Sequence, residues 1–293
     1  MIPVALLIFS ASLWGLAWWP LKYFASQGLG GPMVALLTFG GLGLISLPLL
    51  VREFAQWRHC VPLFLLLTLV GGWGNTAYIS ALLAGDVVRV ALLFYLAPVW
   101  GVVGGRIFLA ERITMRRAGA LVSALIGVFM VVGGASAFAA PLGWTDFLAV
   151  TAGLAFSANN IVARHAQAIP NASKTIALFL GCLLTSMALL SFQEGLGALA
   201  LPELPTQVWW YLAAYAIGWL ALATATWQWS VTRMEAGRSG VISIAELIVA
   251  LLSAALIGGE VMDSWELAGA GLIAVAAVLA ALEPAAKDGP ASA

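Results

Sequence analysis

One acidic residue, Glu246, stands inside a long apolar segment of this 293-residue chain. An ionised carboxylate at the centre of a bilayer costs roughly 2.5–3.5 kcal/mol on insertion scales, so such a group is expected to face the protein interior or water. Ser239, Ser243 and Ser253 fall near the same helical face, because they stand seven, three and seven residues away. This pattern favours contact with a substrate amine or exchange of a proton. The alternative is a hydrogen bond between helices made by the neutral acid.

Three further apolar segments carry pairs of hydrogen-bonding side chains. Two pairs are spaced three or four residues apart on one helical face, and the third is a double amide: Asn75 with Tyr78, Thr224 with Gln228, and Asn159 with Asn160. Polar groups at this depth predict the lining of a cavity. The alternative is hydrogen bonding between helices, worth about 0.6 kcal/mol per bond.

Tryptophan is abundant, with 13 residues in the chain. Those near segment ends are typical of the aromatic belts that anchor helices at lipid headgroups. Trp14, Trp18, Trp100 and Trp227 lie deeper, and the first two stand four residues apart on one helical face. A flat aromatic ligand can stack against such rings. The alternative is that the rings pack against a neighbouring helix or lipid.

Pro98 interrupts another apolar segment. Proline removes one backbone hydrogen bond of a helix and bends it. We therefore predict a kink at Pro98 with a role in gating. Tyr95, which stands about one turn earlier, is predicted to lie beside the loosened carbonyl groups and to contact the substrate.

Residues suited to catalysis are confined to segment ends and the tail. This holds for the aspartates at 86, 146, 263 and 288 and for His59 and His165, so a protease-like dyad is not expected. No glycine-rich phosphate loop is present, and Cys60 and Cys182 show no metal-ligand spacing. The sequence therefore predicts no enzyme, no cofactor and no metal. A net charge of zero gives no indication of nucleic-acid binding.

The composition sets the environment in which these residues must be positioned. Hydrophobic residues make up 62% of the chain and charged residues 9%, and the mean hydropathy is +1.02. Soluble domains are about 45–50% apolar and about 25% charged. We predict an all-α membrane protein, because a spanning helix needs about 20 apolar residues. Ten segments meet this expectation: 3–24, 32–51, 61–84, 87–109, 116–134, 143–164, 173–192, 207–232, 238–258 and 264–282.

Basic residues predict the orientation of these ten segments, since cytoplasmic loops are enriched in Lys and Arg. Only Lys22 and Arg89 fall on one side. The other side receives eleven: Arg52, Arg58, Arg106, Arg112, Arg116, Arg117, Arg164, Lys174, Arg233, Arg238 and Lys287. We therefore expect both termini in the cytoplasm.

An internal repeat appears when residues 86–111 are laid over 235–260 at a shift of 149. Three charged pairs then coincide: Asp86 with Glu235, Arg89 with Arg238, and Glu111 with Glu260. At a shift of 142, Trp14-Gly15 meets Phe156-Ser157 and Lys22 meets Arg164. Each repeat holds five segments, an odd number, so the second enters the membrane inverted. Inverted repeats are typical of transporters with a site near the midplane, although chance similarity among apolar helices is the alternative. We predict units 1–138 and 143–284 around a central cavity, and a cytoplasmic tail, 285–293.

The chain resembles the EamA-type, ten-helix members of the drug/metabolite transporter superfamily. The resemblance covers nearly the whole chain and rests on an ordered set of loose motifs: Leu13-Trp14-Gly15 with Lys22, Asn75-x-x-Tyr78-x-x-Ala81-Leu82, Leu96-Ala97-Pro98-Val99, Glu111-Arg112 with Gly119, and Gly259-Glu260 with Gly269. It implies a basket in which spans 1, 3, 4, 6, 8 and 9 surround a cavity, and it implies transport of metabolites. Because of its tryptophans, the chain looks most like the aromatic amino acid exporters. Glu246-Leu247 departs from the paired proline motif, which puts a paired proline gate in doubt.

We therefore predict a transporter of aromatic and other neutral amino acids that works by alternating access. The alternatives are efflux of lipophilic cations by proton exchange and, more distantly, a membrane-embedded enzyme. We expect a monomer in the bacterial inner membrane, with the lipid bilayer and a small-molecule substrate as its partners and no nucleic acid. The predicted substrate-binding residues are Trp14, Trp18, Asn75, Tyr78, Tyr95, Trp100, Asn159, Asn160, Thr224, Trp227, Gln228, Ser243 and Glu246.

Overall fold

The computed structural model describes residues 2–85, 87–132, 141–258 and 263–282, and every regular element in these ranges is a helix. Eight helical segments are long and apolar enough to cross a membrane: Ile2–Ser26, Phe54–Ala84, Arg89–Phe108, Trp144–His165, Asn171–Gln193, Thr206–Arg233, Ala236–Ile257 and Ser264–Ala281. The chain is therefore an integral membrane protein, as predicted. The predicted tail 285–293 and the paired residues Asp86 and Glu260 lie outside the described ranges.

Most spanning segments contain more than one helix. In chain order the helices of the first half are α1 (Ile2–Gly15), α2 (Trp18–Ser26), α3 (Gly31–Ala35), η1 (Leu36–Gly40), α4 (Gly41–Ile45), α5 (Leu47–Arg52), α6 (Phe54–Trp57), η2 (Arg58–Cys60), α7 (Val61–Ala84), α8 (Val87–Phe94), α9 (Ala97–Phe108) and α10 (Met115–Val131). Those of the second half are α11 (Trp144–His165), α12 (Asn171–Glu194), η4 (Leu196–Leu199), α13 (Thr206–Ala214), η5 (Tyr215–Leu220), α14 (Ala221–Arg233), α15 (Ala236–Ser243), α16 (Ala245–Gly258) and α17 (Ser264–Ala281).

Two of the ten predicted spans correspond to shorter helices. The predicted span 32–51 contains the apolar helix Gly31–Ile45, in which η1 is a wider π-helical turn, and then α5. The predicted span 116–134 corresponds to α10, which has 17 residues. Both fall short of the roughly 20 residues of a full crossing. Eight spans are therefore established by length and composition, and ten remains a prediction.

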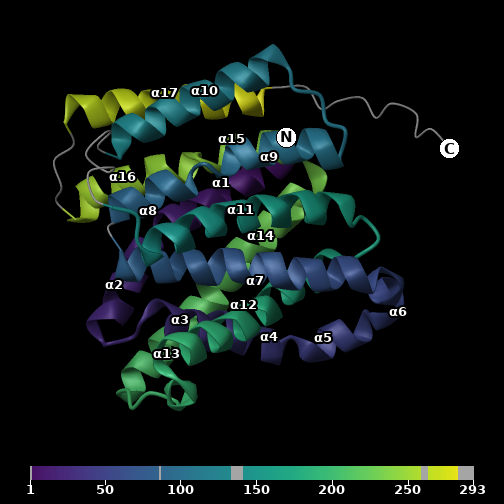
Figure 1. The fold of residues 1–293 in the computed structure, drawn as a ribbon, viewed down its shortest axis with the longest axis vertical. Coiled ribbons are helices and arrows are strands. Elements are labelled where there is room, and N and C mark those ends of the chain that lie inside the picture. The colour runs from purple at the N-terminus through teal and green to yellow at the C-terminus, as the bar shows by residue number, and fades with distance from the viewer. Residues whose placement is uncertain (1, 86, 133–140, 259–262, 283–293) are drawn as a thin grey trace.

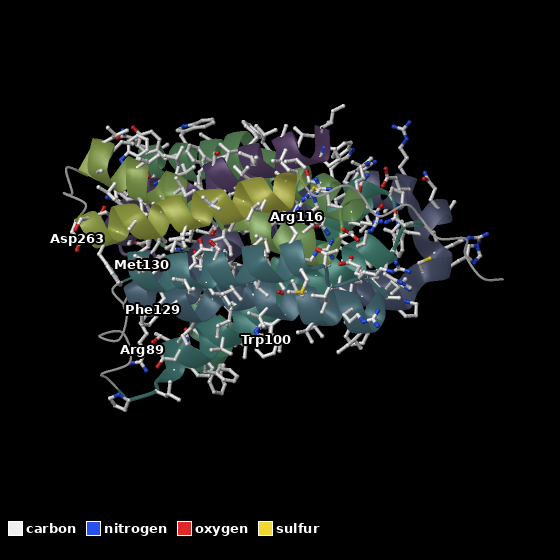
Figure 2. All side chains as sticks on the ribbon, turned by 90° about the horizontal axis from the view of Figure 1, so that it is seen from above. Arg89, Trp100, Arg116, Phe129, Met130 and Asp263 are labelled. Atoms are coloured by element: carbon white, nitrogen blue, oxygen red, sulfur yellow. The ribbon has the colours of Figure 1, made fainter. Side chains whose placement is uncertain are left out.

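The helices run side by side in a layered bundle (Figure 1). α10 and α17 pair at one edge, and α9 with α15 lie next to them. α1 and α11 come next, where α1 packs against α14 and α16 while α11 packs against α7 and α9. α12, α3 and α13 lie toward the opposite edge. Figure 2 shows Arg89 and Asp263 toward one end of the bundle and Arg116 toward the other.

Glycines allow two of these helix pairs to approach closely. A Cβ added to Gly127 in α10 would lie 2.7 Å from the carbonyl oxygen of Gly269 in α17, and one added to Gly269 would lie 2.7 Å from that of Gly127. Gly72 in α7 and Gly181 in α12 are so close that a Cβ on either would collide with the other helix's backbone. Small residues at such contacts give the van der Waals packing that holds helices together in lipid.

Two spanning helices are broken at matching positions. α8 ends at Phe94 and α9 begins at Ala97, and α15 ends at Ser243 and α16 begins at Ala245. A shift of 149 residues places Tyr95, in the first break, on Ile244, the single residue of the second. Pro98 is the second residue of α9, but the second break contains no proline. There the amide of Ile244 donates to Val241 three residues back, which tightens the turn.

Candidate functional site

A cavity lies between helices of both halves of the chain, α1, α7 and α8 on one side and α11, α12, α14 and α16 on the other. The space open to the centres of water molecules is about 40 Å³, enough for a few waters. A larger ligand must therefore displace side chains to enter. The cavity is lined by Trp14, Gly71, Gly74, Asn75, Tyr78, Phe94, Phe156, Asn159, Leu178, Thr224, Trp227 and Glu246.

Glu246 reaches this cavity because it is the second residue of α16, directly after the break at Ile244. Its side chain is buried, and the hydroxyl of Tyr95 donates to its Oε1. The hydroxyls of Tyr95 and Tyr78 also interact. Tyr95 itself lies in the break between α8 and α9, so the two broken helices are joined at their breaks by this hydrogen bond.

An amide cluster joins α11 to α14 beside the cavity. Asn159 Nδ2 donates to Gln228 Oε1 at 3.2 Å and to Asn160 Oδ1 at 3.4 Å. Trp227 Nε1 donates to the same Asn160 oxygen at 3.3 Å. On α7, Asn75 Nδ2 donates to the carbonyl of Gly71 at 2.9 Å. Each of the three predicted polar pairs therefore has at least one member that lines the cavity.

Three buried polar atoms at this site have no hydrogen-bond partner among the described residues: Asn159 Oδ1, Thr224 Oγ1 and Gln228 Nε2. A buried group of this kind costs about 1–3 kcal/mol. Asn159 and Thr224 line the cavity, and Gln228 accepts a hydrogen bond from Asn159. Hydrogen-bonding capacity at this site is thus unmet by the described residues.

A band of aromatic rings forms one wall. Tyr78 stacks on Phe94 with ring centroids 4.1 Å apart, Phe94 lies 5.4 Å from Phe156, and Phe156 lies 5.1 Å from Trp227. Trp14 stacks on Phe39 at 6.3 Å with an interplanar angle of 12°. The rings come from both halves of the chain, and their flat faces suit a flat ligand.

Seven of the predicted site residues are not among those that line the cavity, and four of these seven make no hydrogen bond to a lining residue. Trp18 Nε1 donates to Ser253 Oγ at 2.9 Å, and Ser243 Oγ donates to its own helix at Gly240. Trp100 is 38% exposed and lies at the margin of the bundle in Figure 2. Pro98 packs against Gly240 of α15, where an added Cβ would lie 3.3 Å from Pro98 Cα. Tyr95, Asn160 and Gln228 form a second layer that hydrogen-bonds the lining residues.

Five lining residues were not predicted from the sequence: Gly71, Gly74, Phe94, Phe156 and Leu178. A signal existed for Phe156, because the overlay at a shift of 142 places it on Trp14, which was predicted. Gly74 leaves room for the backbone of Phe156, since an added Cβ would lie 3.2 Å from its amide nitrogen. Leu178 carries no signal that distinguishes it from other buried leucines.

Charged groups near the two ends of the bundle tie the halves together outside the cavity. Glu111 accepts from the amides of Ala236 and Gly237 at 2.7 and 3.2 Å, and Arg117 bridges Glu111 and Glu235. Loss of hydration raises the pKa of Glu111 above its ordinary value, and the two amides and Arg117 oppose that rise.

At the end marked by Arg89 in Figure 2, Arg89 Nε pairs with Asp146 Oδ1 at 2.7 Å and Arg89 Nη2 donates to the carbonyl of Pro141 at 3.2 Å. The residues on the two sides of this ion pair belong to different halves of the chain. Among the described residues that line the cavity, none is Lys, Arg or His.

The model of the EamA-like transporter family matches residues 1–133 and 143–282. A curated relative from Rhizobium johnstonii (strain DSM 114642 / LMG 32736 / 3841), a riboflavin transporter, is 25% identical over 158 residues. That match spans about half of each protein, 52% of this chain and 49% of the relative.

One solved crystal structure shares the fold, with a TM-score of 0.74, 21% identity, and coverage of 95% of this chain and 96% of the other. The family match covers most of the chain in two consecutive copies, and the helices, the cavity and the relative agree with it. The chain belongs to the EamA-like transporter family, and the enzyme alternative has no support from these comparisons.

Proposed function

We propose that this protein transports small aromatic metabolites that carry an amino group, with aromatic and other neutral amino acids as the first class to test. The observation that carries the proposal is the composition of the cavity wall: one carboxylate, a band of aromatic rings and unpartnered polar atoms, contributed by both halves. Glu246 would receive the ammonium group, the band from Tyr78 to Trp227 would hold the ring, and Thr224 and Asn159 would hydrogen-bond the remaining polar atoms.

Alternating access between two inverted halves is the mechanism that we propose. Two sets of contacts support it, because each set maps onto itself under the shifts of 142 and 149 residues that relate the repeats. Gly15 lies against the carbonyl of Glu246, and its repeat counterpart Ser157 donates to the carbonyl of Ala97 at 2.6 Å, where Ala97 is the counterpart of Glu246. Helix pairs exchange likewise, since α1 packs on α14 and α16 while α11 packs on α7 and α9. Such halves can rock about a fixed central site.

A second candidate is transport of a flavin. Its support is the riboflavin transporter relative, together with the amides of Asn75 and Asn159, which suit the edge of a flat heteroaromatic ring. The lipophilic-cation alternative is supported by the carboxylate of Glu246. These three substrate classes differ in the charged groups that they carry, and a transport assay with one labelled member of each class separates them.

The test uses the purified protein in liposomes, with labelled tryptophan, riboflavin and a lipophilic cation, each with and without a pH gradient. We expect saturable tryptophan movement that Glu246→Gln reduces at least tenfold. Movement of the cation or of riboflavin alone would replace the proposal by that alternative. Tryptophan transport by Glu246→Gln with an unchanged rate and pH dependence would remove any proton role for this carboxylate.

A further inference from the structure

We propose that the cavity recognises the protonated amine of its ligand and gives no matching ion pair to a carboxylate, so aromatic amines without a carboxyl group are substrates in their own right. This inference rests on the proposed function, because it assumes that an aromatic compound occupies this cavity. It is carried by the distribution of charges around the site.

The negative side of that distribution is Glu246. Tyr95 donates to its Oε1, and its other oxygen, Oε2, has no hydrogen bond within the described part of the chain. The carboxylate therefore keeps one oxygen for a ligand donor without breaking the hydrogen bond between the two helix breaks. An ammonium group is suited to this position because a charge-assisted hydrogen bond is stronger than a neutral one.

The described cavity lining contains no positively charged side chain. Three cations buried in other parts of the protein interact with groups outside the lining. Arg89 pairs with Asp146, and Arg117 pairs with Glu111 and Glu235. Lys174 Nζ donates to the carbonyl of Ala163 at 2.8 Å. No cation therefore lines the described cavity wall to receive a ligand carboxylate.

A ligand carboxylate would have to rely on neutral donors. Two fully buried donors beside the cavity have no partner among the described residues, the hydroxyl of Thr224 on the cavity wall and Nε2 of Gln228, which contacts Asn159. Removing an ion from water without an opposite charge is costly, and neutral hydrogen bonds return only part of that cost. A zwitterion thus loses hydration at both charges and gains an ion pair only at its ammonium group, whereas an amine loses hydration only at the charge that Glu246 pairs.

Four compounds that share the indole ring separate these contributions. Tryptamine carries only the amine, and indole-3-propionate carries only the carboxylate. Tryptophan carries both charged groups, and indole carries neither. Binding to the detergent-purified protein is measured at constant pH, by competition of each compound against labelled tryptophan. We expect tryptamine to bind at least tenfold more tightly than indole and at least as tightly as tryptophan, and indole-3-propionate to bind no more tightly than indole.

Glu246→Gln should remove the preference for tryptamine over indole while indole binding stays within twofold. The matched control, Glu203→Gln, changes an exposed carboxylate outside the cavity and should leave the ranking intact. The ranking in the unaltered protein tests the inference even where the Gln variant does not fold.

Two negative outcomes are distinguishable. Tight binding of tryptophan with tryptamine no tighter than indole overturns the inference and leaves the proposed function standing. Absence of binding by all four compounds, with no tryptophan transport in liposomes, overturns the proposed function itself. Enhanced tryptamine binding that persists in Glu246→Gln also overturns the inference, because it assigns the preference to another group.

Discussion

At the residue scale, the burial of the Thr224 hydroxyl costs free energy that no hydrogen bond among the described residues offsets. This hydroxyl is buried on the cavity wall with no hydrogen-bond partner among the residues that the structure describes, whereas the hydroxyl of Thr76, also buried, lies 2.9 Å from that of Thr185. Both residues lie in spanning helices, on α14 and α7. The hydroxyl of Thr76 therefore serves helix packing, and we propose that the hydroxyl of Thr224 serves a ligand.

Thr224→Val is expected to stabilise the ligand-free protein by about 1 kcal/mol, because valine has a similar shape and removes the unpartnered hydroxyl. Transport should fall several-fold if the ligand uses that hydroxyl. Thermal unfolding in detergent and initial transport rates in liposomes measure the two effects. Thr76→Val is the control and should destabilise the protein with little change in substrate affinity. A destabilised Thr224→Val would contradict our description of this atom.

Polar residues were easier to predict than aromatic ones. Glu246, Asn75, Asn159 and Thr224 stand out because lipid cannot satisfy them, so their burial in the protein interior follows from the sequence. A tryptophan is stable against lipid, against a helix or in a cavity. Trp14 and Trp100 are therefore alike in sequence terms, although one lines the cavity and the other lies at the margin of the bundle.

At the scale of elements, the contact between α10 and α17 depends on the absence of two side chains. Gly127→Ala places a Cβ 2.7 Å from the carbonyl oxygen of Gly269, so the helices must separate. We expect a loss of about 1–3 kcal/mol from overpacking, measured as a lower unfolding temperature. Gly119→Ala on the same helix is the matched control, since its added Cβ meets nothing within 4 Å. The control should be neutral or gain up to about 1 kcal/mol from helix propensity. Equal effects in the two variants would contradict the packing argument.

The helix breaks were predictable only in part. Pro98 predicts a bend in the first half, and α9 indeed begins one residue before it. In the second half the break at Ile244 has no proline, and the hydroxyl of Ser243 just before it donates to the backbone carbonyl of Gly240 instead. Hydropathy likewise predicts the spans 32–51 and 116–134 without indicating that they form interrupted or short helices, because composition does not report where a helix ends.

At the scale of the whole molecule, the orientation of the protein in the membrane remains a prediction. Arg116 and Glu203 are exposed and are predicted to lie on opposite faces of the membrane, the first cytoplasmic and the second outside. A Cys60→Ser background leaves Cys182, which is fully buried. A membrane-impermeant maleimide added to intact spheroplasts should label Glu203→Cys and should reach Arg116→Cys only after permeabilisation. The reverse pattern would invert the proposed topology.

The helices differ in length across the bundle, and this has a consequence for the surrounding lipid. α7 has 24 residues, whereas α10 and α17 have 17 and 18. At 1.5 Å per residue these correspond to about 36 Å against about 26 and 27 Å, around a hydrocarbon thickness of about 30 Å. The bilayer must thin beside the α10–α17 edge or those helices must stand nearly upright, while α7 tilts. If the two halves rock as we propose, acyl-chain length is expected to change the transport rate, with the α10–α17 edge as the place where the lipid deforms.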